Sequence, residues 1–201
     1  MSAVSTPLRQ VSGLDDGLPR LADATVVMID FQNTYREGVM ALPNADAALV
    51  AGARLLSAAR ELGRPIVHIV NDAGPGTPYD IRAEIGAIIA DVAPEAGEPV
   101  VVKNFPDAFH ETDLHDTLRS AGAGPDLVLA GFMTHLCVAF TAQGAFNRGY
   151  RPTVVAEACA TRALAAPDRT PLPADVLHTA ALTTVGDLFG LICPTVADLL
   201  D

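Results

Sequence analysis

Short apolar runs alternate with amphipathic stretches along the whole chain, and this alternation limits the possible folds more than any other feature. Six runs have the length of strands and are apolar at nearly every position, which is typical of strands buried on both faces. The predicted strands are residues 24–29, 65–70, 100–102, 126–130, 152–156 and 191–193. The predicted helices are residues 45–62, 79–91, 112–121, 134–148, 174–189 and 196–200.

Buried strands that are each followed by a helix predict a parallel sheet covered on both sides. With right-handed crossovers, this pattern gives a three-layer, doubly wound α/β fold with helices on both faces of about six strands. The 201 residues suit one domain with a sizeable core, so we predict a single domain, residues 1–201, in which residues 1–20 form an N-terminal arm.

The charge balance excludes several classes of partner. Thirteen basic and 24 acidic residues give a net charge of -11, which repels phosphate backbones and anionic membranes. We therefore expect no nucleic-acid or membrane partner, and no apolar run is long enough to span a bilayer. The three cysteines form no short pairing pattern, and residues 1–10 contain no apolar signal region, so we expect reduced thiols and a cytoplasmic location.

Ligands of such sheets bind beyond the carboxyl ends of the strands, so the polar residues there are candidates for chemistry. Cys137 follows the most apolar strand, in a predicted helix that Thr134 would cap. In the first helical turn, unpaired N–H groups and the helix dipole favour a thiolate. A free cysteine is equally typical of simple packing, and packing is the favoured interpretation for Cys159 and Cys193.

Two charged residues end other predicted strands. Asp30 follows residues 24–29, and Lys103 follows residues 100–102. Taken alone, Asp30 is typical of an aspartate that caps a loop, and Lys103 of a lysine that extends into water. Together with Cys137, they supply a base, a cation and a nucleophile at one rim of the sheet, which is the logic of a catalytic triad.

The sequence also resembles the isochorismatase-like hydrolases, from about residue 24 to residue 189. The motifs that carry the resemblance, in this order, are Asp30-Phe31-Gln32, Lys103 with Ala108-Phe109 and Thr112-Asp113-Leu114, and Gly131-x-x-Thr134-x-x-Cys137-Val138. The resemblance implies the strand order 3-2-1-4-5-6, which places Lys103 on an edge strand, so that its side chain must reach inward. It further implies that Cys137 is the nucleophile, Asp30 the general base and Lys103 the third triad member.

The resemblance also implies an oxyanion hole and a homo-oligomer. A cis peptide bond between Phe132 and Met133 would direct the Met133 N–H, together with the Cys137 N–H, at the substrate oxygen. Side chains near the strand ends are candidates for binding a small-molecule substrate. These candidate substrate-binding residues are Phe31, Gln32, Tyr35, Phe109, Thr134 and His135.

Departures from the family pattern narrow the chemistry. Asp72 matches the aspartate of the metal motif of nicotinamidase-type members, but Gly74 stands where the histidine should be. A lone carboxylate does not make a transition-metal site, so we expect no metal and no cofactor. Isochorismatases proper lack the cysteine, so Cys137 points to the metal-free branch that includes N-carbamoylsarcosine amidase-like enzymes.

The predicted function is therefore cysteine-dependent hydrolysis of a C–N bond, amide or ureido, in a small molecule through a thioester. Two alternatives stay open. One is a non-enzymatic redox-sensing or binding protein on the same fold, which would not need Asp30 and Lys103. The other is an isochorismate-type vinyl ether hydrolase, against which the presence of Cys137 counts.

Overall fold

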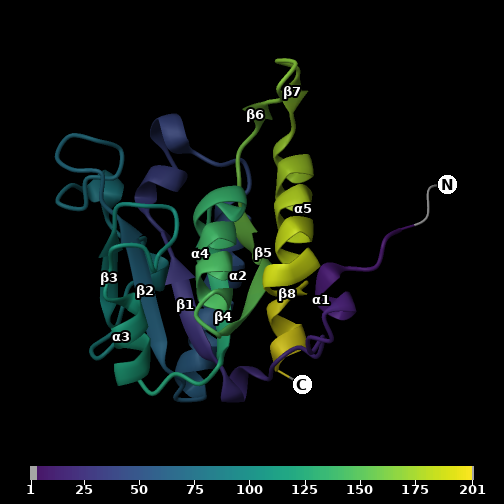
Figure 1. Cartoon of the computed structure of the whole chain (residues 1–201). Helices are drawn as coiled ribbons and strands as arrows, with labels where there is room; N and C mark the ends of the chain where they lie inside the picture. The colour runs from purple at the N-terminus through teal and green to yellow at the C-terminus, as the bar shows by residue number, and fades with distance from the viewer. Residues whose placement is uncertain (1–3, 201) are drawn as a thin grey trace.

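A computed structural model describes residues 4–200, and a six-stranded parallel sheet lies at its centre (Figure 1). The strand order is β3-β2-β1-β4-β5-β8, so the predicted order is confirmed, with β8 as the sixth strand of the sheet. The strands of this sheet are β1 (Thr25–Ile29), β2 (Ile66–Asn71), β3 (Val100–Lys103), β4 (Asp126–Phe132), β5 (Arg151–Ala160) and β8 (Leu191–Cys193). The α-helices are α1 (Leu8–Val11), α2 (Ala45–Glu61), α3 (Leu114–Ser120), α4 (Ala139–Phe146) and α5 (Ala174–Thr184).

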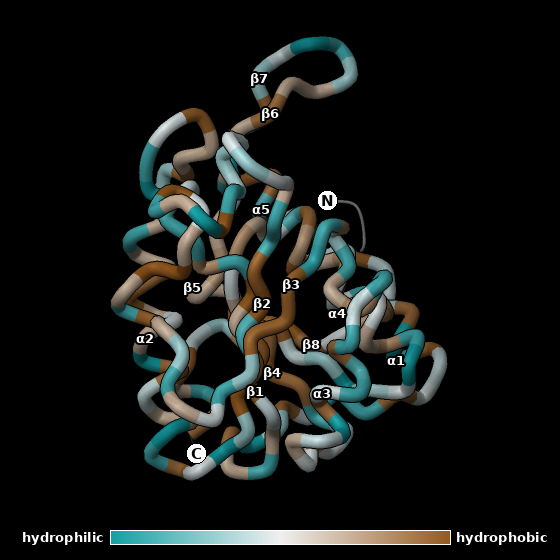
Figure 2. Tube along the Cα trace, turned by 90° about the vertical axis from the view of Figure 1, so that its left-hand side faces the viewer, coloured by the Kyte–Doolittle hydropathy of each residue, from teal (hydrophilic) through white to brown (hydrophobic). Residues whose placement is uncertain are grey.

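Two hydrophobic clusters hold the layers together, one on each face of the sheet. All five residues of β1 are buried, and its side chains alternate between the clusters because successive strand residues face opposite sides. Val26 and Met28 pack with the residues of α2, whereas Val27 and Ile29 pack with residues of α3 and α4. In Figure 2, the apolar residues are concentrated along the central strands.

The predicted helix at residues 79–91 is wrong. This region contains two 3-10 turns instead, Glu84–Gly86 and Ala90–Val92. Gly86 lies against the backbone of Asp80, so close that a Cβ atom at Gly86 would be 2.3 Å from the Asp80 oxygen. The Asp80 carboxylate accepts the N–H groups of Gly76 and Arg82, which fixes a loop in place of helical hydrogen bonds.

Two other predicted helices have π-helical turns at one end. The helix expected from Thr134 begins with the π turn Thr134–Val138 and continues as α4, and Met133 rather than Thr134 occupies the N-cap position. The Thr134 hydroxyl instead bonds His178 Nδ1 at 2.9 Å. The helix expected to end at residue 189 consists of α5 followed by the π turn Val185–Phe189.

The N-terminal arm lies against the end of this last π turn. Arg9 is buried, and its guanidinium donates to the carbonyls of Leu188 and Gly190 and to the Asp16 carboxylate. The hairpin of β6 (Leu164–Ala165) and β7 (Pro171–Leu172) was not predicted from the sequence. Its two strands are antiparallel, and it projects from the body of the molecule (Figures 1 and 2). Between residues 4 and 200, no helix has the length and apolar character needed to cross a bilayer.

Candidate active site

The three predicted catalytic side chains meet at the carboxyl ends of the strands. Asp30 follows β1, Lys103 ends β3, and Cys137 lies in the π turn after β4. Lys103 Nζ is 2.7 Å from Asp30 Oδ2 and 3.4 Å from Cys137 Sγ. The Lys103 stem therefore reaches from the edge strand past β2 to β1, and both members of the ion pair have no exposed side-chain surface.

The backbone turns sharply at Asp30. Its N–H continues the ladder by donating to the Ile69 carbonyl, but its φ of 52° is in the left-handed region, which ends the strand. Aspartate tolerates this conformation better than most residues. Asp30 Oδ1 has no hydrogen-bond partner in the part of the chain that the structure describes, so one carboxylate oxygen is free to accept a proton.

Burial sets the resting protonation of the sulfur. Burial, and then the negative charge of Asp30, raise the pKa of Cys137 to about 12, although Lys103 opposes the shift. Burial also raises the pKa of Asp30 against the opposing effect of Lys103. For Lys103, burial lowers the pKa, but the nearby Asp30 and Cys137 together outweigh it and raise the pKa. These shifts favour a thiol over a thiolate for Cys137 at rest, which is the form that the predicted role of Asp30 as general base requires.

Backbone groups lie beside the sulfur. The peptide bond between Phe132 and Met133 is cis, as the resemblance implied. The Met133 N–H has no hydrogen-bond acceptor among residues 4–200, so it is available to a ligand. Gly131 makes the close approach of β4 to β1 possible, because its φ is 138° and a Cβ atom there would lie 1.9 Å from the Ile29 oxygen.

Three of the six predicted substrate-binding residues are engaged within the protein. Gln32 donates from Nε2 to the carbonyls of Asn71 and Gly86, and its Oε1 accepts the Asn71 N–H, so its amide is fully used. The Phe31 ring packs against α2, where a Cβ at Gly52 would lie 2.6 Å from the ring. These contacts commit both side chains to packing or hydrogen bonding within the protein, and their assignment to substrate stays a prediction.

Phe109 is the third of these residues. Its ring stacks on Tyr150, with centroids 5.9 Å apart, and the Arg148 guanidinium lies 4.9 Å from its centroid. Phe109 therefore belongs to the packing of the face that carries α3 and α4.

The remaining three candidates lie nearer the sulfur. Thr134 and His135 share the π turn with Cys137, and His135 Nδ1 is hydrogen-bonded to Thr161 Oγ1. Burial, then the charges of Asp30 and Cys137, raise the pKa of Tyr35 well above its usual range, and its ring lies 5.3 Å from that of Phe132.

Three further residues bear on the site. Asn71 is among the polar residues that directly follow a predicted strand, whereas the sequence did not single out Tyr79 or Arg162. Asn71 Oδ1 accepts from Lys103 Nζ at 3.4 Å, and the Tyr79 ring meets the Tyr35 ring edge-on at 5.9 Å. Arg162 follows β5 by two residues, and its Nε is buried without a hydrogen-bond partner in the described chain. We predicted that this strand ends at residue 156, but β5 continues to Ala160. Arg162 was missed for this reason, because it follows the true end of the strand and not the predicted one.

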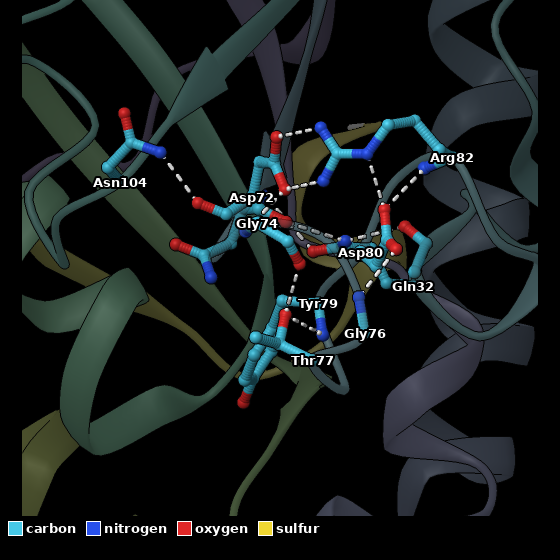
Figure 3. Close-up of polar contacts among 11 residues, drawn as sticks. Gln32, Asp72, Gly74, Gly76, Thr77, Tyr79, Asp80, Arg82 and Asn104 are labelled. Carbon is cyan, nitrogen blue, oxygen red and sulfur yellow. Dashed lines mark hydrogen bonds and ion pairs between the residues drawn. The ribbon is translucent and has the colours of Figure 1, made fainter.

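The guanidinium of Arg82 occupies the region around Asp72, where the sequence departs from the metal motif. Arg82 Nη2 and Nη1 lie 2.9 and 3.0 Å from the two Asp72 carboxylate oxygens, and Arg82 Nε lies 2.6 Å from Asp80 Oδ1 (Figure 3). Within residues 4–200, no three His, Cys, Asp or Glu side chains are grouped so as to hold a metal ion.

Comparison with known proteins agrees with this geometry. The structure matches an isochorismatase of Pseudomonas putida KT2440 with a TM-score of 0.92 and 37% identity, covering 98% of this chain and 100% of that one. A secreted isochorismatase effector of Verticillium dahliae is 31% identical over 92% of this chain and 94% of its own length. A maleamate amidohydrolase of Pseudomonas putida is 31% identical over 68% of this chain and 72% of its own length. The isochorismatase domain model matches residues 24–190, and the chain therefore belongs to the isochorismatase family.

Proposed function

We propose that this chain is a cysteine hydrolase that cleaves an amide or ureido C–N bond of a small molecule through a thioester. The observation that carries the proposal is the buried group in which Lys103 Nζ lies 2.7 Å from Asp30 and 3.4 Å from Cys137. Burial of an acid, a base and a nucleophile together costs stability, so a fold that keeps them has a use for them. The relative named maleamate amidohydrolase supports an amide as the target.

In the proposed mechanism, proton transfer accompanies attack because the resting sulfur is a thiol. Asp30 takes the proton of Cys137 while the sulfur bonds to the carbonyl carbon. The N–H groups of Met133 and Cys137 hold the resulting oxyanion, and one such donor contributes about 3 kcal/mol. Lys103 stabilises the negative charge throughout.

The C–N bond then breaks, and Asp30 returns the proton to the leaving nitrogen, which departs as ammonia or an amine. Asp30 next takes a proton from a water molecule that attacks the thioester. The acid product leaves, and Asp30 gives the proton back to Cys137, which restores the resting state.

The alternative of a redox sensor fits the site less well. Sensor cysteines are accessible and have a lowered pKa. Cys137 is 5% exposed, and a sensor has no need of the buried Asp30–Lys103 pair beside its sulfur.

The test is a panel of small molecules assayed for ammonia release, with isochorismate assayed separately for ether cleavage. The panel contains primary amides and ureido compounds, each with and without a carboxylate, because Arg162, two residues beyond β5, has a buried Nε with no hydrogen-bond partner among residues 4–200. We expect turnover of at least one amide or ureido compound, loss of turnover in Cys137→Ala, and a trapped acyl-enzyme mass on Cys137. Turnover that is unchanged in Cys137→Ala, or turnover of isochorismate alone, would overturn the proposal.

Two further parts of the proposal concern the setting of the enzyme. The reduced state of all three cysteines is consistent with action in the cytoplasm, although the Verticillium dahliae relative is named as secreted. We also propose a homo-oligomer, which light scattering of the purified chain tests directly.

A further inference from the structure

Residues 72–82, which we call the strap, leave the end of β2 directly beside the catalytic lysine. The Asp72 N–H donates to the Lys103 carbonyl at 3.0 Å, and Asn104 Nδ2 donates to the Asp72 carbonyl at 2.6 Å. The preceding residue, Asn71, contacts Lys103 Nζ. The first residue of the strap is thus fixed to the catalytic strand.

A single guanidinium joins the two ends of the strap. Arg82 binds both oxygens of Asp72 through its terminal nitrogens and Asp80 through Nε, as Figure 3 shows. The hydrogen bonds from Arg82 hold the pKa of the Asp72 carboxyl below its usual range, and backbone N–H groups and Arg82 do the same for Asp80. Both carboxylates are therefore charged at neutral pH, and the strap is closed by charged hydrogen bonds, which are stronger than neutral ones.

The side chain that the strap carries toward the site is Tyr79. It lies between Thr77 and Asp80, whose own hydrogen bonds to Gly74 and Gly76 shape the strap from inside. The Tyr79 ring is half-buried against the core and edge-on to the Tyr35 ring at 5.9 Å.

Two ring contacts connect Tyr79 to the segment that carries the sulfur. The Tyr35 ring lies 5.3 Å from that of Phe132, the residue that starts the turn leading to Cys137. Burial raises the pKa of Tyr79, and the charges of Cys137 and Asp30 raise it further. The sulfur itself keeps only 5% of its residue's surface exposed.

We propose that Arg82 is a positioning residue of this site: by closing the strap, it holds Tyr79 over the approach to Cys137, where the phenol contacts the bound substrate. The part that concerns substrate rests on the proposed hydrolase function. The part that concerns access to the sulfur does not, since it follows from the arrangement of the strap alone.

The experiment measures alkylation of Cys137 by iodoacetamide, located by peptide mass because Cys159 and Cys193 are also free thiols. Loss of charged hydrogen bonds in Arg82→Gln opens the strap, and we expect alkylation of Cys137 to be about tenfold faster than in wild type. Arg82→Lys keeps the charge without the planar fork and is expected to fall between the two. Tyr79→Ala keeps the ion network and is expected to speed alkylation to a similar extent.

The matched control is Arg54→Gln. Arg54 is also a largely exposed arginine, and it pairs with Glu157 at 2.9 Å from α2, outside the strap. Its loss removes the same charge and is expected to leave alkylation within twofold of wild type. With a substrate from the panel, we expect Arg82→Gln to raise KM about tenfold and to change kcat by less than threefold.

Alkylation rates equal to wild type in both Arg82→Gln and Tyr79→Ala would overturn the proposal, as would an equal acceleration in Arg54→Gln. If circular dichroism shows that Arg82→Gln is unfolded, Tyr79→Ala decides alone. If no panel compound is turned over, the hydrolase function fails, whereas the alkylation rates still decide whether the strap covers the sulfur.

Discussion

Replacement of Lys103 by methionine isolates the energetics of the buried pair. The change keeps most of the stem's volume but removes the ammonium that lies 2.7 Å from Asp30, and neither side chain of the pair is exposed. Removal of one member of a buried ion pair leaves an uncompensated charge and costs about 3–5 kcal/mol. We therefore expect Lys103→Met to lower the free energy of unfolding by about 3–5 kcal/mol at pH 7.

The loss should depend on pH with a defined sign. Without Lys103, burial raises the pKa of Asp30 further above its unfolded value of about 3.9. In Lys103→Met, the folded state favours the protonated form of Asp30. The fold is therefore most stable below the unfolded pKa of this carboxyl, and it loses stability as pH rises through the folded pKa. The deficit of Lys103→Met relative to wild type should therefore be smallest near pH 4 and should grow toward pH 8.

Urea unfolding between pH 4 and pH 8, at equal m-values, measures this deficit. The control is the double variant Asp30→Asn/Lys103→Met, which removes both charges and should recover most of the loss, because a neutral pair of similar shape has no buried charge left unpaired. A deficit below about 1 kcal/mol at pH 7, or one that is equal at pH 4 and pH 8, would refute the reasoning that the pair is ionised in a dry interior.

Three other predictions follow from the geometry. Asp30→Asn removes the negative charge that helps to raise the pKa of Cys137. We therefore expect alkylation of Cys137 to become faster at pH 8 and any turnover to be lost. Slower alkylation would contradict the assignment of charges. Gly131→Ala places a Cβ 1.9 Å from a backbone oxygen of β1, so we expect a loss of more than about 3 kcal/mol in thermal or urea unfolding, and a stable variant would mean that β4 can shift. Hydrogen bonds from Arg60 hold the pKa of Glu98 at about 2, so its contribution is fully present above about pH 4.5 and is lost as pH falls through 2. Glu98→Gln should therefore cost about 1–3 kcal/mol at pH 7, and this cost should shrink as pH falls from 4.5 through 2, measured by urea unfolding.

The sheet could be predicted because parallel strands buried on both faces leave a distinct pattern in the sequence. Five consecutive buried residues in β1 produce a continuous apolar run, and apolar runs also identified the other five strands, although the edge strand β3 exposes Val100 and Val102. The loop at residues 79–91 has apolar residues at helical spacing, but Gly86 packs on the backbone of Asp80, and such a long-range contact is not visible in local spacing.

For the site, the sequence indicates which residues follow strands but not where their side chains point. That rule found Asp30, Lys103 and Cys137, because all three lie at strand ends that meet at one edge of the sheet. It assigned Gln32 to substrate, although the amide of Gln32 is used by backbone groups of the neighbouring loop. The rule did not find Tyr79. This residue lies eight positions beyond the end of β2, and only the fold of the strap brings it toward the site.

The contacts of Lys103 also suggest which residue moves the proton in the proposed reaction. An ammonium has three N–H donors, and those of Lys103 have three acceptors within reach: Asp30 at 2.7 Å, and Asn71 and Cys137 at 3.4 Å each. A lysine held in this way has no donor left to bind substrate, and its raised pKa keeps it from acting as a base. Asp30 Oδ1 has no hydrogen-bond donor within the described chain, and burial raises the pKa of this carboxyl toward that of the groups it must serve. Proton movement therefore falls to Asp30, and Lys103 acts as a fixed charge that keeps the carboxylate and the sulfur together while the proton passes between them.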